Sequence, residues 1–426
     1  MPPLPRPQGF TLIEMMTGIT ISMIVMAGVA LTFLGVTNAY HAESNITSVT
    51  EGSRVSMSFL ERQLKLAGYG VDPRVAFDFD TGAGALLKDN DGLTGLGAAA
   101  GGFTTDDLAF RYRDPQFVMS GVMPSLVQIT SLSAPTGCPT LPSLKDGQGL
   151  MVICQSAPQT ALYLTANGAQ AAGATTLLVQ KHPTIYNNAA TWTDLAWPTI
   201  APGCVGSGVY VFLLNEFRVR TVALQSSGVI ASRPYLVVFH GLKNAPDPAT
   251  NADFDPLAPD VEDFQVAYLM NRPFYGSSFA ATNSVDAPAG NASNPADYIL
   301  GDVDANSVAT NALPRLTDAA PAYSDNYDSV NRYNGSPANI RGVRVSVLLR
   351  SAFPEATRRK AYSTQSLENH TVAVPAADGF YRTLVTSTVH TDNLSSRSLF
   401  LPPIASLALE QSSTSSTLQD FNYCGG

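Results

Sequence analysis

A long stretch almost free of charge near the start of the chain limits the folds that this sequence can adopt. Between Arg6 and Glu43 the only charged residue is Glu14. As a helix, residues 10–36 would be roughly 40 Å long, enough to cross a hydrocarbon core of about 30 Å once. The many Leu, Ile, Val and Phe residues each favour insertion by about 0.3–0.6 kcal/mol, which together outweighs the roughly 2.5–3.5 kcal/mol cost of Glu14. The sequence therefore predicts one membrane-spanning helix.

The segment before this stretch is short and polar, with Arg6 as its only charged residue. An ordinary secretory signal is cut after its apolar part. Here a plausible cleavage position, after Gly9, precedes the apolar part, so the anchor would be retained. Because no Lys or Arg follows until Arg54, the positive-inside rule places the N-terminus in the cytoplasm and the bulk of the chain on the other side.

The helix is predicted to continue beyond the membrane, because no proline occurs between Gln8 and Asp72. A mostly apolar face recurs there at steps of three and four. Its residues are Ile46, Val49, Ser53, Met57, Leu60, Leu64 and Ala67. Helix-ending residues follow as Gly68, Gly70 and Pro73. We expect a leader over 1–9, a membrane helix over 10–38, an amphipathic continuation over 39–69 and a globular head over 70–426.

The head contains short runs enriched in β-branched and aromatic residues. Because these runs do not alternate with long helical patterns, they predict a largely antiparallel sheet. They are 108–113, 126–132, 150–155, 175–180, 209–214, 217–224, 235–240, 261–269, 340–350 and 382–390. Two segments without such runs, near 78–102 and 276–339, are predicted to be long surface insertions. The expected fold class is α+β, with a long N-terminal helix packed on a large, β-rich head.

The residues Gly9-Phe10-Thr11-Leu12-Ile13-Glu14, followed by an apolar helix, resemble the processing site of type IV prepilins and type II secretion pseudopilins. In those proteins a prepilin peptidase cuts after the glycine and N-methylates the new first residue. The resemblance implies cleavage after Gly9 and methylation of Phe10. Glu14 would then be the fifth residue of the mature chain, where these families carry a glutamate.

Glu14 has two interpretations, which can hold at different stages. Thr11 and Glu14 have the spacing of a capping box, in which each side chain bonds the other's backbone N–H at a helix start. Alternatively, Glu14 pairs with the Phe10 amine of its own or a neighbouring mature chain. Leaving the carboxylate unpaired costs at most about 3.7 kcal/mol, the cost of protonating it at pH 7. An ion pair at about 4 Å returns a similar amount at an effective dielectric constant of about 20.

Later segments extend the resemblance to PilW-type minor pilins. They are 54–69, 261–268, 340–351 and 381–393. The last departs from the family by carrying Asp392-Asn393 where Arg-Asn is common. The resemblance implies a minor pilin that assembles with other minor pilins to prime or cap a type IV pilus, in pilus biogenesis, motility and adhesion.

The same resemblance implies the partners and the location. The partners would be the prepilin peptidase, other minor pilins, the major pilin and an inner-membrane assembly platform, with a PilY-type tip adhesin as a further candidate. The chain would sit in the inner membrane with its head in the periplasm, and would reach the cell surface within the pilus. Two alternatives stay open: a type II secretion pseudopilin (GspJ-like), and an adhesin or ligand-binding head displayed on a pilin stalk.

The four cysteines are Cys138, Cys154, Cys204 and Cys424, all on the side of the membrane where disulfides persist. Three pairings are possible. The preferred one joins Cys138 to Cys154 in a local loop and Cys204 to Cys424 at the tail. A zinc site is not expected, because no CxxC spacing occurs and the histidines are not clustered near cysteine.

Enzyme signatures are missing from the sequence, which has no HExxH, GxSxG or P-loop motif. The histidines carry no local context that would select a catalytic base; they are His41, His182, His240, His370 and His390. We therefore expect a protein that is not an enzyme and that has no cofactor.

Metal and nucleic-acid binding are also not expected. Asp302, Asp304 and Asn306 begin like a calcium loop, but Ser307 and Leu313 replace its glycine and glutamate. The net charge of −9 and the pI near 5.0 argue against a broad nucleic-acid surface.

Overall fold

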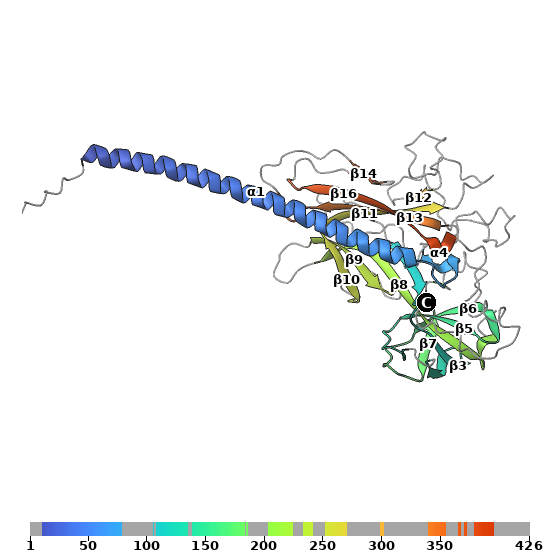
Figure 1. The fold of residues 1–426 in the computed structure, drawn as a ribbon. Helices are drawn as coiled ribbons and strands as arrows, with labels where there is room; N and C mark the ends of the chain where they lie inside the picture. Colours follow the sequence, from blue (N-terminus) through green and yellow to red (C-terminus); the bar gives the residue numbers. More distant parts are fainter. Residues whose placement is uncertain are drawn as a thin grey trace, which may run out of the picture.

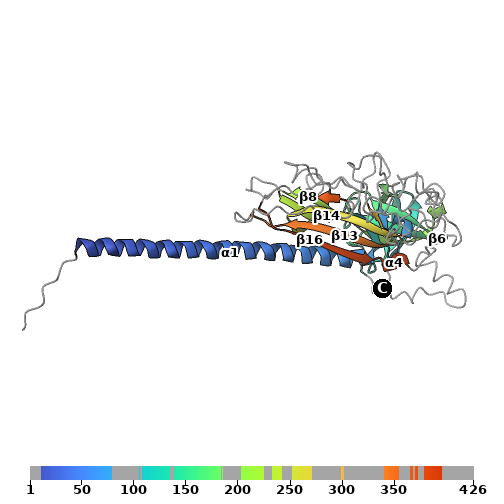
Figure 2. The same ribbon diagram turned by 90° about the horizontal axis from the view of Figure 1, so that it is seen from above.

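One long helix projects from a β-rich head in this computed structural model (Figures 1 and 2). The described residues are 11–78, 105, 108–134, 139–183, 185, 203–224, 233–241, 252–270, 299–301, 340–354, 365–367, 370–372 and 379–395. Helix α1 (Leu12–Leu66) extends away from the head over its N-terminal half, and its C-terminal half lies along the sheets. The predicted α+β class, with a mainly antiparallel head, is confirmed.

The C-terminal half of α1 packs on the head through one face. Its buried residues are Val49, Ser53, Ser56, Met57, Leu60 and Leu64. Ile46, which was expected on this face, is exposed. Burial of this face begins at Val49, one turn further along the helix. The helix ends before Gly68, whose φ of +80° favours glycine and whose added Cβ would lie 2.4 Å from Leu394.

One sheet of the head has four antiparallel strands, against which α1 packs. In spatial order they are β12 (Ile299–Gly301), β11 (Val261–Met270), β13 (Ile340–Arg350) and β16 (Arg382–His390). Helix α1 contacts β13 and β16 of this sheet and also β10 of the other. Short elements complete this part: η1 (Pro73–Val75), β14 (Gln365–Leu367), β15 (His370–Val372) and α4 (Asp392–Ser395).

A second sheet has ten antiparallel strands and closes partly on itself. Its open part consists of β1 (Phe77–Asp78), β2 (Leu108–Arg113), β9 (Arg233–His240) and β10 (Phe254–Pro259). Its closed part consists of β3 (Met119–Ser125), β4 (Gln128–Ser133), β5 (Gly149–Cys154), β6 (Ala157–Ala166) and β7 (Leu177–Lys181). Strand β8 (Gly208–Leu224) belongs to both parts.

The closed part is a small barrel. The pairings run β8, β3, β4, β7, β6, β5 and back to β8, so they leave no free edge. This barrel lies at the end of the head far from the N-terminus of α1 (Figure 1). It encloses its own apolar core, separate from the core that α1 shares with the sheets.

Strand β8 corrects the prediction of two separate strands over 209–214 and 217–224. The intervening Asn215 and Glu216 stay in the ladder, opposite Tyr112 and Arg111 of β2. Glu216 is buried within this strand. The single long strand thereby joins the barrel to the rest of the head.

Candidate assembly and anchoring site

The first turn of α1 forms a complete capping box around Glu14. Thr11 donates to Glu14 Oε2 from its backbone N (2.9 Å) and from its hydroxyl (2.8 Å), and Glu14 N donates to Thr11 Oγ1 (3.3 Å). In the single chain the carboxylate is therefore hydrogen-bonded but exposed, and no cation neutralises it among the described residues. A cation that approaches the helix start could still reach it.

The N-terminal half of α1 presents apolar side chains on every side. The exposed ones are Leu12, Ile13, Met15, Met16, Ile19, Ile21, Met23, Ile24, Val25, Met26, Val29, Leu31, Phe33, Leu34 and Val36. The helix is long and apolar enough to cross a membrane once. A helix that is apolar all round needs lipid or other helices around it.

The processing residues Gly9 and Phe10 lie outside the described residues, which begin at Thr11. Their cleavage and methylation therefore stay predictions.

The C-terminal half of α1 is also tied to the head by polar contacts. Ser387 Oγ of β16 donates to Glu61 Oε1 (2.6 Å), Tyr112 OH donates to Gln63 Oε1 (2.8 Å), and Asn393 Nδ2 donates to the Lys65 carbonyl (2.9 Å). Together with the buried apolar face, these contacts make the helix and the head one mechanical unit. A displacement of the anchor would be passed on to the head.

A buried charge cluster joins the barrel to the helix-bearing part of the head, and the sequence contained no signal for it. Glu216 Oε1 accepts hydrogen bonds from Arg111 Nε (2.7 Å) and His182 Nε2 (2.8 Å), and the side chains of all three are about 1% exposed. Arg111 also donates to the carbonyl of Val75, just after α1 (3.0 Å). His182 directly follows β7, so residues far apart in sequence meet here.

The surroundings of Glu216 hold it as a carboxylate. Burial alone would raise its pKa, but the neighbouring His182 and Arg111 outweigh burial and lower the pKa to about 2. The N–H of Ile185 donates to His182 Nδ1 (3.3 Å), which assigns the ring proton to Nε2. Both ring nitrogens are therefore occupied, and this histidine has the geometry of a structural link.

The other candidate histidines do not form a common site. His240 pairs with Asp255 at the surface (2.9 Å), and His41 lies beside Tyr40 on α1. His370 lies in β15, and His390 lies opposite Gly342 at the end of β16. Within the described parts of the chain, no group of three or more His, Cys, Asp or Glu residues is placed to hold a metal ion. The calcium-like segment 302–313 lies outside those parts.

The preferred disulfide pairing was wrong. Cys154 bonds Cys204, with a Cα–Cα distance of 5.4 Å. Cys154 at the end of β5 lies opposite Val209 of β8, and Cys204 shortly precedes β8, so strand pairing brings the two cysteines together. Cys138 and Cys424 lie outside the described residues.

We expect the Cys154–Cys204 bond to stabilise the barrel by about 2–4 kcal/mol, because it closes a long loop with a sequence separation of 50. Cys204→Ala should therefore lower the urea midpoint of the oxidised chain, and a reductant should lower the midpoint of this variant by less than it lowers that of the parent. Peptide mapping without reduction should recover a Cys154–Cys204 cross-link. A Cys138–Cys154 cross-link instead would contradict this pairing.

The N-terminal segment of the chain carries a motif known from a described family. Residues 4–30 match the family described as the prokaryotic N-terminal methylation motif. No curated protein matches the chain. Among solved structures, the chain is similar to a type IV-like pilin from Thermus thermophilus, with 13% identity over 58% of this chain and 86% of that chain and a TM-score of 0.21. The chain thus combines a prepilin-type methylation motif with an apolar helix suited to membrane anchoring and an antiparallel β head.

Proposed function

We propose that this chain is a minor pilin of a type IV pilus, processed after Gly9, stored in the inner membrane and assembled through its N-terminal helix. The observation that carries the proposal is one continuous helix whose first half is exposed and apolar and whose second half is fixed to the head. The methylation motif over residues 4–30 supports it. Other minor pilins, the major pilin and the assembly platform are the proposed partners.

In this proposal the capping box is the resting state of Glu14. Cleavage after Gly9 would create a charged amine on Phe10, next to Thr11. On assembly the carboxylate would exchange its Thr11 hydrogen bonds, or share them, with the amine of a neighbouring chain. Such an ion pair is stronger in the low dielectric of a lipid or helix bundle than in water, so it would favour assembly and set the register.

Three variants test this role, because they separate the charge from the cap. Glu14→Ala removes both, Glu14→Gln keeps a hydrogen-bond acceptor for Thr11 without the charge, and Thr11→Ala removes the cap but keeps the charge. We expect both Glu14 variants to reduce the chain recovered in sheared pili, relative to the membrane fraction, by about tenfold or more. A tenfold loss corresponds to about 1.4 kcal/mol.

Thr11→Ala should remain near the parent level in the same assay. Membrane insertion should be unchanged in all three variants. If Thr11→Ala lost as much incorporation as Glu14→Ala while Glu14→Gln assembled normally, Glu14 would act as a helix cap only.

Two alternative functions are compatible with the same helix and head. A type II secretion pseudopilin would have the same anchor, and deletion would then abolish exoprotein secretion and leave twitching motility intact. A displayed adhesin or ligand-binding head is favoured by the barrel, which has its own core and lies far from the anchor. Ligand binding that persists in Glu14→Ala cells would support that second function.

We propose a structural role without catalysis. Supporting this, the one fully buried histidine–carboxylate pair in the described residues has both imidazole nitrogens engaged in the fold. An enzymatic activity abolished by changing any one histidine would contradict the proposal.

A further inference from the structure

We propose that the edge of the head nearest the anchor rests on an anionic bilayer surface, with the Phe353 ring in the headgroup region. The inference assumes the membrane anchoring proposed above. We call this part, residues 351–354 and 379–382, the membrane-facing edge. It lies where β13 ends and β16 begins, and its Phe353 carbonyl accepts a hydrogen bond from Asn45 Nδ2 of α1 (3.4 Å).

The turn that carries Phe353 is held in place. Ser351 Oγ donates to the Phe353 carbonyl (2.9 Å) and accepts from the Tyr381 N–H (3.1 Å), and Ser351 N donates to the Tyr381 carbonyl (2.7 Å). The Phe353 side chain is nevertheless 70% exposed. A fixed turn that presents an aromatic ring to the outside suggests a surface that the ring contacts.

The distribution of exposed apolar side chains points to the bilayer. Apart from α1, the large exposed hydrophobic residues among those described are Phe353 and four residues of the barrel and its adjoining turns: Val122, Val127, Leu178 and Val205. Only Phe353 of these is hydrogen-bonded to the part of α1 that directly follows the predicted membrane segment. Tyr40, which is 69% exposed, lies near the end of that segment. Aromatic residues favour the membrane–water interface, where one side is apolar and the other wet.

The distances along the helix fit this arrangement. Residues 38–45 rise about 10 Å along the axis. The headgroup region beyond the hydrocarbon core is about 5–8 Å thick. A tilt of about 20° lowers a group 10 Å from the helix axis by a further 3–4 Å. The Phe353 ring can therefore reach the headgroups without unfolding any part of the head.

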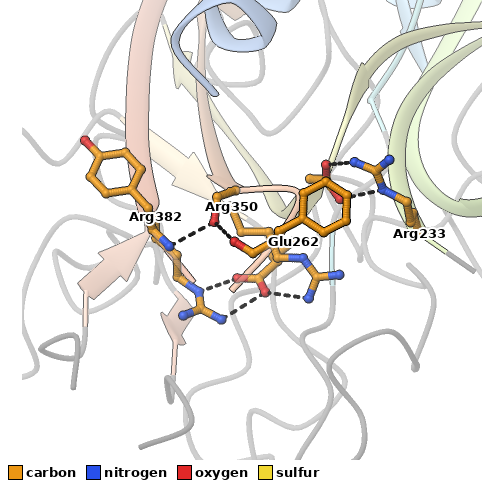
Figure 3. A network of polar contacts seen from close by, with 8 residues as sticks. Arg233, Glu262, Arg350 and Arg382 are labelled. Atoms are coloured by element: carbon orange, nitrogen blue, oxygen red, sulfur yellow. Dashed lines mark hydrogen bonds and ion pairs between the residues drawn. The ribbon is translucent and has the colours of Figure 1, made fainter. Parts of the chain in front are cut away.

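The charges beside the edge suit anionic lipids. Glu262 lies between Arg382 (Nε–Oε2 2.6 Å) and Arg350 (NH1–Oε1 3.3 Å), and Arg233 pairs with Asp260 (Figure 3). Three arginines thus face two carboxylates, which leaves one positive charge. The sequence that follows the turn, residues 355–360, lies outside the described residues; it has one acidic residue, Glu355, and three basic residues, Arg358, Arg359 and Lys360. Basic residues next to a membrane anchor attract anionic headgroups.

The arginines also brace the edge. The Arg350 guanidinium lies 4.6 Å from the centroid of the Phe380 ring and that of Arg382 lies 5.9 Å from it. These contacts connect β13, β16 and the turn into one unit. The edge can therefore take up contact with a surface as a rigid body and orient the whole head.

Tryptophan quenching in the full chain tests the inference. The chain is reconstituted in vesicles of phosphatidylethanolamine and phosphatidylglycerol whose acyl chains are brominated near the headgroup. Three variants are compared: F353W at the edge, Y40W on the anchor and V127W on the barrel. The parent chain, with Trp192 and Trp197, gives the background. We expect F353W to lose fluorescence to an extent close to Y40W, while V127W stays at background.

The outcomes separate the two proposals. If Y40W is quenched and F353W matches V127W, the edge does not touch the bilayer and the inference is overturned, while anchoring stands. If Y40W itself is not quenched, the membrane anchoring has failed and this inference fails with it. Phe353 is largely exposed, so F353W should fold, and unchanged near-ultraviolet circular dichroism checks this.

Discussion

Replacing Gly9 by leucine should leave the chain as an uncleaved precursor. A prepilin-type peptidase must bring the backbone at the scissile bond close to its catalytic groups, and a glycine without a side chain permits that approach. We expect intact-mass spectrometry of the parent to show loss of residues 1–9 and one added methyl group on Phe10. The Gly9→Leu chain should show neither change, so the effect is all or none.

Gly18→Leu is the matched control for this experiment. It makes the same chemical change within the apolar helix, at a glycine with no neighbouring atom within 4 Å. It should be cleaved and methylated like the parent. Normal maturation of the Gly9→Leu chain would reject the leader assignment, whatever the behaviour of the control.

Glu216→Gln should cause the largest loss of stability among the changes considered in the head. Removing the charge breaks the buried pair of Glu216 with Arg111, and breaking a buried pair typically costs about 3–5 kcal/mol. Urea unfolding of the full chain in detergent micelles, followed by near-ultraviolet circular dichroism, measures the loss. Glu51→Gln, at an exposed position of α1, is the control and should change the midpoint little.

The stability of the same two variants should depend on pH to different extents. The pKa of Glu216 is lowered from 4.5 to about 2 in the folded chain. The carboxylate therefore stabilises the fold above pH 4.5, and this contribution is lost as the pH falls towards 2. Glu216→Gln should be less sensitive to pH over that interval than Glu51→Gln. Equal pH profiles would show that this cluster contributes nothing to acid sensitivity.

The strands show where local sequence was informative. Strands β2 and β16 begin and end where their runs of β-branched and aromatic residues predicted. Strand β3 was missed because Gly121 and Pro124 interrupt its pattern. Strand β10 was missed because it contains Pro256 and Pro259. Among the described strands it pairs with β9 alone, and prolines are tolerated in a strand at the edge of a sheet. In both strands, pairing with neighbours outweighs weak local preference.

In the candidate site, too, local sequence predicted some features and not others. The capping box of Thr11 and Glu14 depends on residues three positions apart, so the sequence predicted it directly. The disulfide could not be chosen from spacing, because the barrel pairs β5 with β8 across a long loop and brings Cys204 to Cys154. The link between Arg111, His182 and Glu216 joins three separate strands or their ends, and no local pattern predicts it.

The sequence by itself determined the anchor: an apolar helix with one carboxylate near its start, the methylation motif that overlaps this start, and the continuation into an amphipathic half. These features depend on helical periodicity and on transfer from water to lipid, both of which act on neighbouring residues. Only the tertiary structure decided the closed barrel, the disulfide, the buried Glu216 cluster and the position of Phe353 beside Asn45. These features depend on strand pairing between distant segments, whose register follows from the burial of the whole sheet.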